Sequence, residues 1–87
     1  MKNIVVMGST GSIGIQSLDV ISKDNSYNVV GLTCHSNANL LFEQAKKHSP
    51  DFVAIDVIDS SHDLFNLCKG NNIELITGSK ASSNIPF

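Results

Sequence analysis

Short apolar runs alternate along the chain with segments whose apolar residues recur at helical spacing. The runs are rich in β-branched residues and are typical of strands buried on both faces of a parallel sheet. Four strands are predicted, over residues 4–7, 29–34, 52–56 and 73–77. The intervening segments carry cap residues or turn formers at their ends, which bound helices. Three helices are predicted, over residues 12–21, 40–46 and 64–68.

Strict alternation of strands and helices with short loops predicts right-handed crossovers and a parallel sheet. The expected fold class is α/β, a Rossmann-like, partial doubly wound parallel sheet of about four strands and three helices. Residues 82–87 could begin one more helix, which Pro86 would stop. Only half of a nucleotide-binding sheet is present, so we expect residues 1–87 to form one incomplete domain with an uncovered apolar face.

Composition narrows the classes of partner. A length of 87 residues suits one small domain or a piece of a larger one, which excludes a two-domain enzyme. The formal net charge of −2 provides no basic surface, so nucleic acid is not an expected partner. Apolar residues make up 41% and charged residues 16%, too apolar for disorder, and no run is long enough to span a membrane. We expect a soluble globular chain.

Cysteine and histidine positions give no metal signature. Cys34 and Cys68 belong to no ligand spacing, and none of the three histidines has a histidine partner four residues away on one helical face. The apolar run near the N-terminus is too short for a secretory signal. We therefore expect reduced thiols, a cytoplasmic location and no metal site in this chain.

The strongest chemical signal is a loop with glycines at positions 8, 11 and 14, between the first predicted strand and the first helix. A glycine-rich turn in that context is typical of dinucleotide binding, because the helix N-terminus attracts a pyrophosphate. Hydroxyls of residues 9, 10 and 12 could add donors, and an ordinary turn is the alternative. The N–H groups expected to be free for the ligand belong to Thr10, Gly11, Ser12 and Ile13.

The end of the second predicted strand bears on the choice of cofactor. An NAD site usually places an acidic residue there to accept from the ribose 2′-OH. This chain instead has His35, Ser36 and Asn37, which could donate to a 2′-phosphate, so NADP is favoured over NAD. Capping of the second helix by Ser36 or Asn37 is an equally weighted alternative, and one residue can serve both purposes.

These residues together resemble a known family. The string VMGSTGSIG at residues 6–14, followed by SLDVI at 17–21, resembles the start of the 1-deoxy-D-xylulose 5-phosphate reductoisomerases. Residues 29–32, Asn37, Leu41 with Gln44, Pro50 and the strand at Val53, and Gly78 extend the similarity. The resemblance covers about residues 1–80 and implies an N-terminal NADPH-binding domain.

The resemblance implies an enzyme of the non-mevalonate isoprenoid pathway. It would rearrange 1-deoxy-D-xylulose 5-phosphate and reduce it to 2-C-methyl-D-erythritol 4-phosphate, with NADPH and Mg²⁺ or Mn²⁺. By position, the phosphate contacts fall on Thr10, Gly11, Ser12 and Ile13, and the 2′-phosphate contacts on residues 35–37. The family commonly has glycine and then a basic residue before the asparagine, so Ser36 stands where a cation is expected.

Catalytic residues and metal ligands of the family lie downstream of this region, so none is assigned here. We therefore expect no turnover from this chain alone, and self-association into a homo-oligomer through its uncovered surfaces. The alternatives are a stand-alone nucleotide-binding module and a remnant without catalysis. A short-chain dehydrogenase is disfavoured, because Tyr27, the only tyrosine, lacks the lysine expected four residues later.

Overall fold

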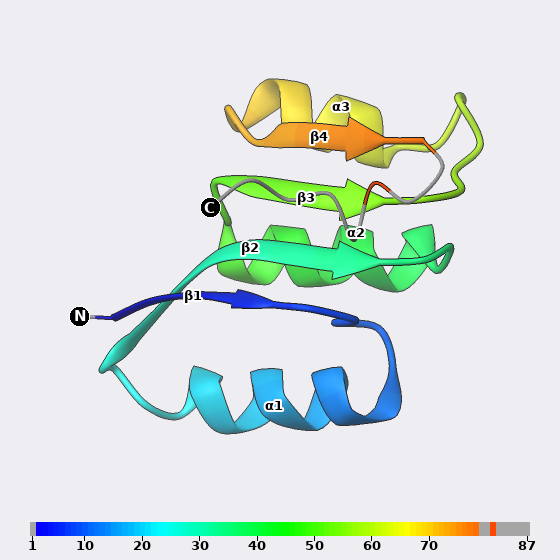
Figure 1. Ribbon diagram of the computed structural model, residues 1–87. Coiled ribbons are helices and arrows are strands. Elements are labelled where there is room, and N and C mark those ends of the chain that lie inside the picture. Colours follow the sequence, from blue (N-terminus) through cyan, green and yellow to red (C-terminus); the bar gives the residue numbers. More distant parts are fainter. Residues whose placement is uncertain (1, 79–80, 82–87) are drawn as a thin grey trace.

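The computed structural model describes residues 2–78 and 81. A four-stranded sheet and three α-helices alternate along this part of the chain (Figure 1). The strands are β1 (Lys2–Val6), β2 (Tyr27–Cys34), β3 (Phe52–Ile55) and β4 (Glu74–Thr77). The helices are α1 (Ser12–Ser22), α2 (Ala38–His48) and α3 (Leu64–Gly70). All three strand pairs are parallel, which confirms the predicted α/β class.

Two strands begin earlier than predicted, because backbone pairing continues into polar residues that the apolar pattern does not mark. β1 begins at Lys2 and β2 at Tyr27, each two residues before its apolar run. Lys2 pairs with Tyr27, and its N–H donates to the carbonyl of Ser26 at 2.8 Å, so the ladder extends into polar, exposed residues. The helix considered for residues 82–87 lies outside the described residues.

The strand order β1-β2-β3-β4 advances in one direction across the sheet. Right-handed crossovers that advance in one direction place their helices on the same face, and α2 packs against both α3 and β2 (Figure 1). The described residues thus supply one helical layer of a doubly wound sheet. The core between the sheet and this layer contains Val6, Leu18, Val29, Leu32, Cys34, Leu41, Ala45, Val53, Ile55, Leu64 and Cys68.

An irregularity in the pairing of β1 with β2 sets which way β2 side chains face. Ile4 pairs with Val29, but Val5 pairs with Gly31, so β2 contains one extra residue at this point. Beyond it, Leu32 and Cys34 join Val29 in the core, although strict alternation would separate them. Thr33 therefore lies on the opposite face from Leu32, where it reaches the end of β1.

The β1 edge of the sheet is apolar and open. Among the residues that the structure describes, β1 pairs only with β2. A groove of about 980 Å³ lies between β1 and α1, and its lining includes Met7 (53% exposed), Ile13 (81%) and Val20 (68%). Exposed apolar side chains therefore lie at this edge, whereas the uncovered helix-packing face expected from the sequence stays a prediction. No helix in residues 2–78 or 81 is long and apolar enough to cross a membrane.

The fold depends on the apolar contacts of α2. Leu41 is fully buried in the core, so Leu41→Ala should cost about 2–5 kcal/mol, a large share of the roughly 5–15 kcal/mol typical of a domain. The matched change at an exposed position, Val57→Ala, should cost less than about 0.5 kcal/mol. Urea unfolding of both variants measures the difference. Equal losses of stability would contradict this assignment of the core.

Candidate functional site

The glycine loop joins the carboxyl end of β1 to α1, and two of its glycines are required by the backbone. Gly8 has a φ of +64°, in the left-handed region that glycine adopts most easily. Gly14 lies against the backbone of the loop itself, where an added Cβ would come within 2.7 Å of the Ser9 Cα atom. The glycine-rich turn predicted after the first strand is confirmed. Gly14 packs on residues 8 and 9 at the end of β1.

The N-terminus of α1 is open. Gly11 is its N-cap residue, and no side chain caps the helix. The N–H groups of Ser12 and Ile13 have no acceptor among the described residues, and the first turn contains no acidic residue. An added Cβ on Gly11 would meet only the Gly8 carbonyl, at 3.4 Å. Free donors, a favourable helix dipole and an open approach together form an anion-binding arrangement.

Two details of the loop differ from the sequence prediction. The N–H of Gly11 was expected to be free, but it donates to the carbonyl of Gly8 at 3.0 Å and closes a turn. The hydroxyl of Ser9 was expected to face a ligand, but Ser9 is fully buried. Thr10, Ser12 and Ile13 remain partly or fully exposed and are the accessible residues of the predicted set, with Gly11 between them.

The loop is anchored from two sides by residues that the sequence analysis did not assign to the site. On the β2 side, the Thr33 hydroxyl accepts from the Gly8 N–H at 3.1 Å, and its carbonyl accepts from the Ser9 N–H at 2.8 Å. On the α2 side, the Gln44 Nε2 donates to the Ser9 carbonyl at 2.7 Å. Both anchors, Thr33 and Gln44, are polar residues at positions where the strand and helix patterns predict buried side chains. That mismatch was the signal in the sequence that could have identified them.

The second predicted cluster lies at the carboxyl end of β2. His35, Ser36 and Asn37 are exposed there. The Asn37 Oδ1 accepts from the Leu40 N–H at 3.2 Å and caps α2, which confirms the capping alternative for this residue. Its Nδ2 donors are not used by that bond, so capping leaves it able to donate to a ligand.

An acidic residue lies beside this cluster. The His35 Nδ1 lies 3.0 Å from the Asp56 Oδ2, and the Asp56 side chain is largely buried. No acidic residue directly follows the second strand in the sequence, because Asp56 follows the third. Carboxyl ends of neighbouring parallel strands share one edge of the sheet, so this carboxylate is brought to His35 by tertiary structure.

Cys34 connects the two clusters. Its buried thiol lies between the side chain of Thr10 and the carbonyl of Asn37, to which it donates at 3.9 Å. Burial raises the pKa of this thiol above its usual value and outweighs the hydrogen bond with Thr10, which acts in the opposite direction. The structure thus brings the glycine loop and residues 35–37 to the same edge of the sheet.

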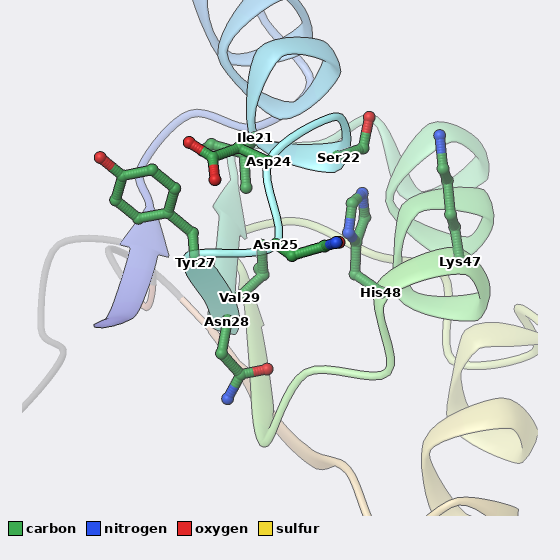
Figure 2. A pocket seen from close by; sticks show the side chains of 9 residues that line it. All are labelled: Ile21, Ser22, Asp24, Asn25, Tyr27, Asn28, Val29, Lys47 and His48. Carbon is green, nitrogen blue, oxygen red and sulfur yellow. The ribbon is translucent and has the colours of Figure 1, made fainter. Parts of the chain in front are cut away.

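A separate hollow lies at the opposite end of the molecule. It has a volume of about 420 Å³, and Figure 2 shows the side chains that line it, among them Asn25 and His48. Burial lowers the pKa of His48, and the neighbouring Lys47 adds to this effect. The hollow contains no predicted site residue, and parallel α/β sheets bind ligands at the carboxyl ends of their strands. The glycine loop is therefore the better candidate site.

The described residues do not fit a metal centre. No group of three or more His, Cys, Asp or Glu side chains in residues 2–78 and 81 could hold an ion. His35 and Asp56 pair with each other, and no third ligand of these types from the described part of the chain completes a site around them.

Sequence comparisons point to one family. The sequence profile of 1-deoxy-D-xylulose 5-phosphate reductoisomerase matches residues 4–86. The chain is 41% identical over 86 residues to the 1-deoxy-D-xylulose 5-phosphate reductoisomerase of Thermoanaerobacter sp. (strain X514), covering 98% of this chain and 22% of that enzyme. The enzyme of the same name from Elusimicrobium minutum is 57% identical over 56 residues, which are 63% of this chain and 14% of the enzyme.

Solved structures give the same result. The Zymomonas mobilis 1-deoxy-D-xylulose 5-phosphate reductoisomerase in complex with NADPH matches with a TM-score of 0.77 and 31% identity, over 88% of this chain and 21% of that one. A DOX-P reductoisomerase with NADPH, fosmidomycin and magnesium matches with a TM-score of 0.78 over 97% of this chain and 22% of the other. At 23% identity, the second match supports the Rossmann-like fold alone.

Proposed function

Because the chain belongs to the 1-deoxy-D-xylulose 5-phosphate reductoisomerase family, we propose that it forms the NADPH-binding portion of such an enzyme. The observation that carries the proposal is the open N-terminus of α1, where the Ser12 and Ile13 N–H groups lack acceptors directly after the glycine turn. This arrangement fits a pyrophosphate. Calorimetric titration of the full chain with NADPH measures the affinity and tests the proposal directly.

Within this proposal the two clusters bind different parts of the cofactor. Thr10, Gly11, Ser12 and Ile13 surround the pyrophosphate, and His35, Ser36 and Asn37 face the 2′-phosphate. Asp56 orients the His35 ring through Nδ1, so that the ring stands beside the proposed position of the 2′-phosphate. NADPH supplies a hydride when bound, and these residues bind and orient it.

The whole reaction is proposed for a longer protein. The chain spans about a fifth of the Thermoanaerobacter relative, at 22% of its length. Isomerisation and reduction of the phosphorylated sugar, in the cytoplasm, would then need residues that this chain does not contain. Its described residues offer no metal ligand set, so the divalent cation would be held elsewhere in such an enzyme. The alternative of a stand-alone nucleotide-binding module is not favoured, because the family profile and the relatives all belong to the reductoisomerase.

The glycine loop gives the first test of binding. Gly11→Val should weaken NADPH binding at least about tenfold, because branched carbons would occupy the approach to the Ser12 and Ile13 N–H groups. The fold should persist, since Gly11 has an ordinary φ of −80° and its nearest neighbour is 3.4 Å from an added Cβ. Calorimetry measures the affinity, and Ile15→Val, one turn further along α1, is the matched control. Unchanged affinity in Gly11→Val would remove the phosphate role of the loop.

Cofactor choice tests the second cluster. Wild-type chain should bind NADPH more tightly than NADH, and Ser36→Arg should widen the gap by about tenfold, because a guanidinium pairs with the phosphate dianion. Affinity for NADH should stay the same. The control Asn66→Arg adds an equal charge at an exposed position of α3. If Ser36→Arg improved both cofactors equally, or neither, residues 35–37 would not face the 2′-phosphate.

We also propose that the open edge makes the isolated chain associate with itself. Exposed Met7, Ile13 and Val20 line the groove beside β1, and burying each such side chain is worth about 1.5–3 kcal/mol. Sedimentation velocity should show oligomers, and Ile13→Lys should shift them towards monomer.

The isolated chain should also show no substrate-dependent NADPH oxidation with Mg²⁺ or Mn²⁺. A compact monomer at all concentrations would contradict the first expectation, and turnover the second.

A further inference from the structure

Gln44 is an unusual residue for the buried face of α2. It lies one turn after Leu41 and beside Ala45, both in the core, and only 9% of its surface is exposed. Its Nε2 donates to the Ser9 carbonyl at 2.7 Å, a contact that joins α2 to a loop 35 residues earlier in the chain.

Stability alone does not account for this glutamine. Its Oε1 is buried without a hydrogen-bond partner among the described residues, and the Ser9 hydroxyl beside this contact is in the same state. A buried polar atom without a partner costs free energy that one hydrogen bond of the same side chain only partly offsets. An apolar side chain of similar length would remove that cost, but it would leave the Ser9 carbonyl without its donor. What the amide supplies beyond packing is therefore this one donor to the loop.

The contact fixes the direction of one peptide group in the glycine loop. In a planar trans peptide the C=O and the following N–H point in opposite directions. Holding the Ser9 carbonyl towards α2 therefore turns the Thr10 N–H away from α2. That N–H has no acceptor among the described residues. Thr33 fixes the two preceding N–H groups, of Gly8 and Ser9, from the β2 side.

We infer that Gln44 is a positioning residue for the phosphate loop: it holds the Ser9 carbonyl inward so that the Thr10 N–H stays directed at the pyrophosphate. This role rests on the proposed binding of NADPH. Gln44 is buried behind the loop and acts through Ser9 and Thr10, without touching the cofactor. Loss of its Nε2 frees the peptide between Ser9 and Thr10 to rotate and leaves the loop less preorganised.

The test compares two ligands on the full 87-residue chain. Gln44→Met keeps the length of the side chain and removes the donor. It should raise the Kd for NADPH about five- to tenfold, while the Kd for 2′-AMP, which has a 2′-phosphate and no pyrophosphate, stays within about twofold. The Thr10 amide resonance should shift in the ¹⁵N spectrum of the free protein. Gln16→Met, the same change at an exposed glutamine of α1, is the control and should alter neither affinity.

The outcomes separate this role from the proposed function. Unchanged NADPH affinity in Gln44→Met, or equal weakening of NADPH and 2′-AMP, would overturn the positioning role and leave NADPH binding intact. Wild-type chain that binds no NADPH would overturn the proposed function and this role with it. If Gln44→Met does not fold, Gln44→Leu, which suits the apolar neighbours Leu41 and Ala45, provides the same comparison.

Discussion

The first helix can start at Ser12 only because Gly14 has no side chain where it crosses the backbone of Gly8 and Ser9. That close approach places the N-terminus of α1 directly at the carboxyl end of β1. It also brings the loop within reach of Thr33 on one side and Gln44 on the other. Any Cβ at position 14 would push the helix away, and both anchors and the open N–H groups would lose their positions together.

The irregular pairing of β1 and β2 also acts on the glycine loop, because it places Thr33 beside Gly8. One extra residue in β2 reverses the alternation of its side chains, so that Leu32 and Cys34 enter the core. Thr33 is thereby turned towards the end of β1, where it accepts from Gly8. The same strand then delivers Cys34, between Thr10 and Asn37, to the carboxyl edge of the sheet. A local change in register thus assembles the candidate site from two separate loops.

At the open edge of β1, a sheet this small leaves apolar side chains exposed to solvent. Within the described residues three helices cover the sheet on one side, yet apolar side chains of β1 and α1 line an exposed groove at its edge. A domain of this size buries only about 60% of its unfolded surface, so every uncovered side chain matters to its stability. The chain spans 22% of the length of its Thermoanaerobacter relative.

The sequence by itself determined the elements, their order, the parallel class of the sheet and the glycine loop, because these follow from local spacing and from the conformational freedom of glycine at position 8. It also offered Ser36 or Asn37 as a cap of the second helix, and the structure assigns the cap to Asn37. Tertiary structure alone decided the single direction of the strand order, the burial of Ser9, and the contacts of Asp56 with His35 and of Gln44 with the loop. These depend on where strand ends and helix faces meet, between residues far apart in the chain. No periodicity within one segment contains that information.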